Sequence, residues 1–169
     1  MSQPVIRLAT LSDLPRLHAV IERAYRGEEA RAGWTHEGDL IEGARTDAAT
    51  LEAILANPDA RLLIALNDES PIGCVQVTDR GDGLCYLGLL CVEPLLQTGG
   101  LGRLLLEAAE NLACDTFGAS AMEMTVIDSR VELIAYYERR GYVRTPERRD
   151  FPIAVTPRLY MTVLVKSLR

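Results

Sequence analysis

Three glycines, Gly99, Gly100 and Gly102, stand within four positions between an apolar stretch that ends near Val92 and an amphipathic stretch that begins at Leu101. A glycine-rich turn lets backbone N–H groups approach a ligand closely, because no Cβ obstructs them. The first turn of a following helix adds unpaired N–H groups and the positive end of the helix dipole, and both attract phosphate. The pattern therefore predicts a pyrophosphate cradle. It is also compatible with a tight strand-to-helix turn that binds nothing, because glycine turns are common.

Two familiar nucleotide-binding motifs can be compared with this turn. A P-loop needs a lysine directly after its glycines, and here Gly102 is followed by Arg103, so a P-loop is excluded. The dinucleotide fingerprint G-x-G-x-x-G is incomplete, since Leu105 occupies the third glycine position, although Asp128 could mimic the ribose-binding acid. That fingerprint also normally begins near the first strand of a domain. A dinucleotide-binding fold is therefore disfavoured.

Apolar periodicity predicts the elements that must position the turn. The chain begins with a strand over residues 4–9 and a helix over 10–25. A loop or broken helix over 31–45 and a second helix, which starts at 46–47 and ends before Pro58, come next. A β-meander follows over 60–70, 71–83 and 84–94. There follow a helix from Leu101 to near Gly118, a strand over 120–128, a short helix closing at Gly141, a loop-rich stretch over 143–152 and a last strand over 158–168. The strands on either side of the 101–118 helix are expected to pair in parallel, as a β-α-β unit does.

Composition limits the class of protein. The 169 residues fit a single domain, 1–169, and 48% of them are hydrophobic, which is enough for a substantial core. No apolar stretch approaches the ~18 residues of a membrane span, and the N-terminus lacks a signal-peptide layout, so we expect a cytoplasmic protein with no membrane partner. The net charge of -6 argues against a nucleic-acid partner, because binding to the phosphate backbone needs a concentrated basic face.

The cysteines predict no metal chemistry. Cys74, Cys85, Cys91 and Cys114 form no C-x-x-C pair and stand mostly in apolar stretches. Free cysteine in such stretches behaves as a small buried hydrophobic residue. We therefore expect structural thiols and no metal site.

Two motifs carry a family resemblance. Gln97-x-x-Gly100-x-Gly102 resembles the acetyl-coenzyme A (acetyl-CoA) signature Q/R-x-x-G-x-G/A of the GNAT superfamily of N-acetyltransferases, and the sequence YYERRGY over 136–142 resembles the downstream Y-E-x-x-G-F/Y element. The expected order of elements matches that family over nearly the whole chain. The resemblance implies an α/β (α+β) fold with a mixed, centrally splayed β-sheet flanked by helices. It also implies transfer of an acetyl group from acetyl-CoA to a primary amine by direct attack in a ternary complex.

An alternative from another class is a CoA-binding regulatory or interaction domain without turnover. The resemblance implies a set of cofactor-binding residues: Leu90, Cys91, Val92, Gln97, Thr98, Gly99, Gly100, Leu101, Gly102 and Arg103. Backbone groups at 90–92 are expected to pair with the pantetheine arm and to offer a donor to the oxyanion. Gly99 stands where relatives often have a basic residue, for which Arg103 would compensate, and Arg130 replaces a common asparagine.

Tyr137 aligns with the family's usual general acid. A phenol with a pKa near 10 stays protonated at neutral pH and can still protonate a departing thiolate. By helical spacing alone, Tyr136 is nearly as good a candidate. Cys91 is expected to pack rather than to act as a nucleophile, since no histidine lies near it in sequence and direct transfer needs no acyl-enzyme.

Candidates for the acceptor pocket and the general base are Trp34, His36 and Glu123, with Glu37 and Asp39 in the same loop as His36. Relayed water is an alternative base. Trp34 either walls the acceptor site or fastens its loop to the core.

The loop at 145–152, with Arg148, Arg149 and Asp150, is a second candidate wall. The acceptor is expected to be a small-molecule or peptide amine, and the acidic charge balance favours a cationic one. The sequence leaves both a monomer and a homodimer open.

Overall fold

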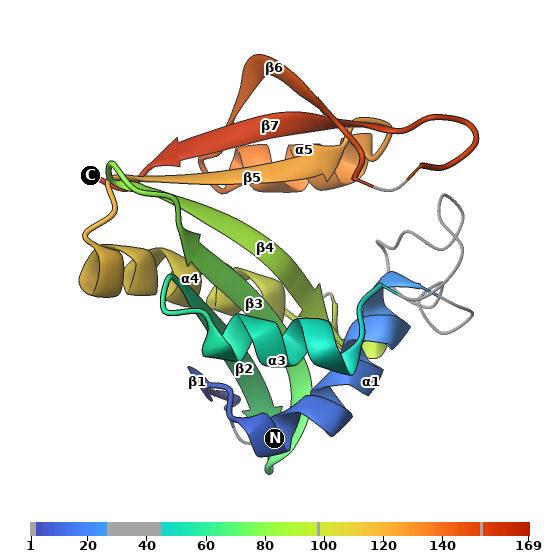
Figure 1. Ribbon diagram of the computed structural model, residues 1–169, viewed down its shortest axis with the longest axis vertical. Helices are drawn as coiled ribbons and strands as arrows, with labels where there is room; N and C mark the ends of the chain where they lie inside the picture. Colours follow the sequence, from blue (N-terminus) through green and yellow to red (C-terminus); the bar gives the residue numbers. More distant parts are fainter. Residues whose placement is uncertain (1–2, 27–44, 98, 153) are drawn as a thin grey trace.

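In the computed structural model, which describes residues 3–26, 45–97, 99–152 and 154–169, a single seven-stranded sheet has the strand order β1-β2-β3-β4-β5-β7-β6 (Figure 1). The strands are β1 (Val5–Leu8), β2 (Ala60–Asn67), β3 (Ser70–Asp79), β4 (Leu84–Val92), β5 (Ala121–Ile127), β6 (Val143–Asp150) and β7 (Tyr160–Ser167). The helices are α1 (Leu14–Tyr25), α3 (Ala48–Ala56), α4 (Leu101–Phe117) and α5 (Val131–Arg139), with 3-10 turns at Leu11–Asp13 and Pro94–Leu96.

The sheet is split at its centre. All neighbouring strands are antiparallel except β4 and β5, whose parallel register covers only Leu84–Tyr86 and Ala121–Glu123. Beyond these residues the two strands diverge (Figure 1). The Tyr86 hydroxyl and the Thr125 hydroxyl, 2.6 Å apart, bridge the start of the opening. The predicted parallel pair and the predicted splayed sheet are both confirmed.

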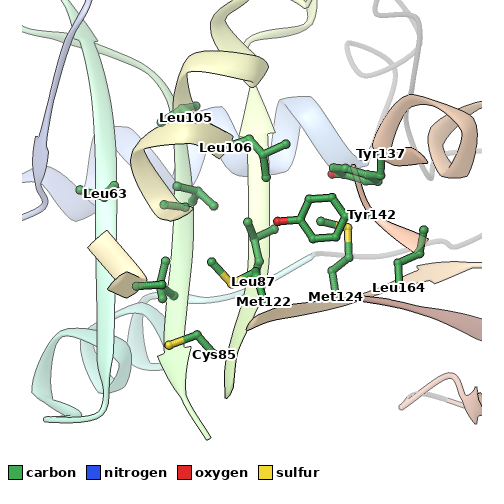
Figure 2. Close-up of a cluster of buried hydrophobic side chains, with 14 of the residues drawn as sticks. Leu63, Cys85, Leu87, Leu105, Leu106, Met122, Met124, Tyr137, Tyr142 and Leu164 are labelled. Atoms are coloured by element: carbon green, nitrogen blue, oxygen red, sulfur yellow. The ribbon is translucent and has the colours of Figure 1, made fainter. Parts of the chain in front are cut away.

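Two layers of helices cover the sheet. On one face, α1 and α3 bury a cluster that includes Leu17, Ile21 and Leu51, which agrees with the helix predicted over residues 10–25 from apolar periodicity. On the other face, α4 and α5 bury the larger cluster shown in Figure 2, which contains Leu105 and Tyr142. Because apolar side chains alternate between the two faces of the inner strands, both helical layers are held by burial of apolar surface.

One stretch differs from its prediction. Residues 143–152 are expected to be loop-rich, yet Val143–Asp150 form β6, paired with β7 in a register that shifts between Arg144 and Arg148. β6 is the outermost strand of the sheet and is mostly exposed, and it contains Pro146, which edge strands tolerate. An edge strand buries little surface, so its sequence lacks the apolar alternation by which strands are recognised.

Glu110 of α4 ties this helix to the far half of the split sheet. Lys166 Nζ donates to both Glu110 carboxylate oxygens, at 2.9 and 3.1 Å, and the Tyr142 hydroxyl donates at 2.9 Å. Burial and the Glu110 charge raise the pKa of Tyr142 well above its usual range, so its phenol remains a donor. The cluster fixes α4 against β7 and against the residues that follow α5.

A Glu110→Ala variant is therefore expected to lose about 2 to 3 kcal/mol of stability, because it leaves the half-buried ammonium group of Lys166 and the buried hydroxyl of Tyr142 without this carboxylate partner. In thermal unfolding this corresponds to roughly 4 to 12 °C for a domain of this size. Glu107→Ala is the matched control, since Glu107 pairs with Arg103 on the exposed side of the same helix. A loss no larger than that of the control would show that the cluster does not stabilise the fold.

Candidate active site

The divergence of β4 and β5 opens a cavity of about 280 Å³. Its floor is formed by Leu87–Val92 of β4 and Met124–Ile127 of β5. Residues of α5 and the start of α4 line it from one face of the sheet, and the C-terminal end of α1 lines it from the other. Elements from both faces of the sheet therefore contribute to the cavity wall.

The glycine turn lies at one side of this cavity. Gly100 is the N-cap of α4, with a φ of +84°, and the first helical hydrogen bond runs from Leu104 N–H to Gly100 O at 3.1 Å. The N–H groups of Leu101, Gly102 and Arg103 precede that bond, so they have no acceptor within the helix. A positive φ at Gly100 and three such donors are the backbone geometry that the predicted anion cradle requires.

Gly102 and Gln97 line the cavity beside this cradle. A Cβ at Gly102 would lie 3.4 Å from the Tyr136 hydroxyl and 3.8 Å from Val92 Cγ2, so a larger side chain here would fill the space between α4 and α5. Arg103 is exposed and paired with Glu107 at 3.1 Å. Gly99 is exposed, Leu101 is buried against the sheet, and Thr98 lies outside the described residues.

The pairing of β4 with β3 determines which backbone groups of β4 face the cavity. The Glu93 N–H donates to Ile72 O, so the backbone groups of Glu93 face β3. By strand alternation, those of Val92 and Leu90 face the opening and those of Cys91 face β3. The 90–92 segment thus presents two of its three predicted residues to the cavity through the backbone.

A strained residue accompanies this arrangement. The register of β4 against β3 shifts between Cys74 and Gln76, and Leu89 there has a φ of +53°. A left-handed conformation costs a non-glycine residue about 1 to 2 kcal/mol, and such strain is concentrated at functional sites. The bulge places the Leu90 carbonyl where the Tyr25 hydroxyl donates to it at 2.6 Å.

Cys91 packs beneath the same bulge. It is buried in the α1 and α3 cluster, and its Sγ lies 3.5 Å from Cys74 Sγ. The hydrogen bond with Cys91 and burial raise the pKa of the Cys74 thiol well above its usual range. Cys74, Cys85 and Cys91 are buried free thiols, and Cys114 is partly buried.

The two tyrosines of α5 have different positions. Tyr137 lines the cavity and is only 6% exposed, and its burial raises its pKa well above the usual range. Its ring packs edge-on against Tyr136 and Tyr142, at centroid distances of 5.4 and 6.1 Å, and Figure 2 shows Tyr137 in the cluster with Met124. The Tyr136 hydroxyl instead lies beside Gly102. The structure therefore places Tyr136 at the cradle and Tyr137 in the core of the cavity wall.

Glu123, predicted as a candidate general base, is paired with an arginine away from the cavity. It is buried, it accepts from both terminal nitrogens of Arg149 at 3.2 and 3.0 Å, and it is not among the described residues that line the cavity. From the predicted second wall, Phe151 and Pro152 line the cavity, whereas Arg148 pairs with Asp128 at 3.2 Å. The remaining acceptor candidates, Trp34, His36, Glu37 and Asp39, lie outside the described residues.

Several lining residues were not predicted from the sequence: Tyr25, Arg26, Arg45, Tyr86, Thr125 and Met161. None belongs to a motif, and they come from separate parts of the fold: the end of α1, the residues before α3, the split strands β4 and β5, and β7. Within the described parts of the chain, no group of three or more His, Cys, Asp or Glu is arranged to hold a metal ion. The helices described there include none that is long and apolar enough to cross a membrane.

Comparisons with known protein families and with individual proteins both identify acetyltransferases as relatives. Residues 35–152 match the family described as acetyltransferase (GNAT) domain. A protein named IAA acetyltransferase, from Azospirillum brasilense, is 30% identical over 106 residues, which cover 62% of this chain and 68% of that protein.

Two solved structures share the fold. The ribosomal-protein-S18-alanine N-acetyltransferase from Escherichia coli has a TM-score of 0.75 and 17% identity, over 98% of this chain and 94% of that one. The yncA protein from Salmonella typhimurium, solved with its cofactor acetyl-CoA, has a TM-score of 0.72 and 18% identity, over 99% of this chain and 95% of that one.

Proposed function

The chain belongs to the GNAT acetyltransferase family, and from this premise we propose that it transfers the acetyl group of acetyl-CoA to a primary amine by direct attack in a ternary complex. The observation that carries the proposal is that the glycine cradle, the open edge of β4 and Tyr137 all border one cavity in the split sheet. Residues from both faces of the sheet line this cavity, so two substrates bound on opposite sides of the split would meet there without a covalent enzyme intermediate.

The cradle fits the proposed co-substrate. Acetyl-CoA would supply an activated acetyl thioester, and its pyrophosphate matches the free N–H groups of Leu101, Gly102 and Arg103. Gln97, Gly99 and Gly100 would complete the contact. The open space at Gly100, where a Cβ would meet nothing within 4 Å, leaves room for a phosphate close to the backbone.

The transfer forms a C–N bond and breaks a C–S bond, while one proton leaves the amine and one reaches the sulfur. Backbone groups of Leu90 and Val92 would orient the pantetheine arm, and an N–H of this segment would stabilise negative charge on the thioester oxygen. Tyr137 would give its proton to the departing thiolate. Its raised pKa keeps the phenol protonated until that moment.

Removal of the proton from the amine would use water. The described lining residues include no carboxylate and no imidazole, and Glu123 is held by Arg149. The hydroxyls of Tyr25, Tyr86 and Thr125 are the polar groups that a water chain could follow. The predicted roles of His36 and Trp34 in the acceptor pocket stay predictions.

Coenzyme A is expected to stabilise the protein against heat, and NAD is not. At a ligand concentration one hundred times Kd the gain is about 2.7 kcal/mol, or roughly 5 to 11 °C for a domain of this size. Differential scanning fluorimetry with both nucleotides measures this directly. Stabilisation by NAD and none by coenzyme A would overturn the cofactor proposal.

The activity itself is tested by thiol release from acetyl-CoA in the presence of a panel of amines. We expect amine-dependent release together with acetylated product identified by mass spectrometry. Tight binding of coenzyme A with no amine-dependent release from any amine would instead identify the protein as a binding domain without turnover.

A further inference from the structure

Two side chains hold the backbone at the bulge in β4, one from α1 and one from β3. The Tyr25 hydroxyl donates to Leu90 O at 2.6 Å, and the Cys74 thiol donates to Leu89 O at 3.4 Å. These two carbonyl groups belong to the peptide planes on either side of the Leu90 Cα. The orientation of both planes is therefore set by side chains.

The strand ladders do not hold Leu90. Among the strands that the structure describes, the register of β4 against β3 assigns Leu90 no partner, and the parallel register against β5 ends at Tyr86. A backbone carbonyl that has left its ladder needs another donor. The Tyr25 hydroxyl is that donor, so a side chain of α1 replaces a strand at this point.

Tyr25 is itself held in place. It is the last residue of α1, whose Ile21 and Ala24 are buried against the sheet. The Arg45 guanidinium lies 4.9 Å from the centroid of the Tyr25 ring, and the Arg45 N–H donates to Glu22 Oε1 at 2.6 Å. The hydroxyl therefore reaches the bulge from an anchored helix and from a ring that is stacked against a second side chain.

The group that Leu90 presents to the cavity is then its N–H. In an extended strand the N–H and the C=O of one residue point to the same side, so the Leu90 N–H faces the opening beside its carbonyl. That N–H shares a peptide plane with Leu89 O, which Cys74 holds. Its direction is thus fixed before any ligand binds.

We propose that Tyr25 is a positioning residue for acetyl transfer: by holding Leu90 O, it orients the Leu90 N–H toward the thioester oxygen, where negative charge develops as the amine attacks. The inference rests on the proposed function. A backbone donor stabilises that charge most when it is already oriented, because nothing has to reorganise at the moment of reaction. In this role Tyr25 contacts neither substrate and exchanges no proton.

The test is Tyr25→Phe, which keeps the ring and the stack with Arg45 and removes only the hydroxyl. Outright loss of an oxyanion donor costs about 10²- to 10³-fold in kcat. The Leu90 N–H remains in this variant and loses only its alignment, so we expect kcat to fall by about 10-fold or more. The KM for acetyl-CoA should change by less than about twofold, because the lost alignment matters mainly in the transition state.

Isotope-edited infrared spectroscopy gives a readout that does not depend on turnover. Acetyl-CoA that carries a heavy carbon isotope at the thioester carbonyl is bound without an amine. The carbonyl should absorb at a lower wavenumber in the wild type than in Tyr25→Phe, because an aligned N–H polarises the C=O bond.

Tyr142→Phe is the matched control. It also keeps its ring and removes one hydroxyl, which donates to Glu110 at 2.9 Å, and Tyr142 is not among the described residues that line the cavity. Once folding at the assay temperature is confirmed, this variant should keep the wild-type carbonyl absorption and the wild-type kcat.

A wild-type kcat in Tyr25→Phe would overturn the inference. So would a lower kcat with an unchanged carbonyl absorption, because the hydroxyl would then serve the proposed water chain and not the Leu90 N–H. Tighter binding of acetyl-CoA by Tyr25→Phe would contradict it as well, since the hydroxyl would then compete with the pantetheine arm for Leu90 O. An equal loss in Tyr142→Phe would refute it by assigning the effect to general loss of structure. Absence of transfer by the wild type to any amine refutes the proposed function, and this inference with it.

Discussion

Tyr137→Phe is expected to bind acetyl-CoA as the wild type does and to turn over about 10²- to 10⁴-fold more slowly, the usual loss for a positioned general acid. The substitution keeps the ring, so the edge-on packing against Tyr136 and Tyr142 is retained. It removes only the hydroxyl that would protonate the thiolate. Because that interaction exists mainly in the transition state, the deficit should appear in kcat rather than in KM.

Tyr136→Phe is the matched control, one residue away on the same helix. Its hydroxyl lies beside Gly102, so its loss should alter coenzyme A affinity more than the rate of a single turnover. Single-turnover transfer with both variants, after folding is confirmed, separates the two roles. A rate loss confined to Tyr136→Phe would assign the acid to Tyr136, and wild-type rates in both variants would reject tyrosine acid catalysis.

The pH dependence of the transfer rate provides a second test of Tyr137 as the general acid. Burial raises the pKa of Tyr137 above the ordinary phenol value of about 10. The hydroxyl therefore stays protonated throughout the neutral and mildly alkaline range, and loses its proton only above that value. The ratio of wild-type to Tyr137→Phe rates should be constant from about pH 7 to about pH 9.5. A ratio that falls toward one within this range would mean that the phenol titrates there and is not the proposed acid.

The features that could be predicted from the sequence are those specified by neighbouring residues. The turn before α4 and the end of that helix follow from Gly100 and Gly118, which adopt φ values of +84° and +63°. The parallel pairing of β4 with β5 follows from a strand, a helix and a strand in succession, because such crossovers obey one handedness. In each case the signal is contained within a few consecutive residues or within the order of elements.

The features that could not be predicted depend on residues far apart in the sequence. Glu123 has the residue type of a general base, but it is bound by Arg149 of β6, an edge strand that carries no apolar pattern. Arg26 and Arg45 flank the 27–44 segment and belong to no motif, yet both reach the cavity.

Valine at either glycine of the cradle should strongly weaken cofactor binding in a protein that remains folded. Gly100→Val adds a branched side chain where a phosphate would approach the backbone, and Gly102→Val fills the space beside the Tyr136 hydroxyl, which a Cβ alone would already approach to 3.4 Å. Each should weaken coenzyme A binding by about 100-fold or more, or about 2.7 kcal/mol. Such a loss corresponds to one or two charge-assisted hydrogen bonds. Gly102→Ala, which adds only the Cβ, should retain most of the affinity.

Gly118→Val is the control for backbone strain. Gly118 closes the same helix at its other end, also with a positive φ and with nothing within 4 Å of an added Cβ, so it shares the strain and the open surroundings of Gly100. Calorimetry of the folded variants should therefore find coenzyme A affinity lost in Gly100→Val and retained in Gly118→Val, while both are destabilised to a similar extent. Equal affinity in these two variants would mean that the glycine turn shapes the chain and holds no phosphate.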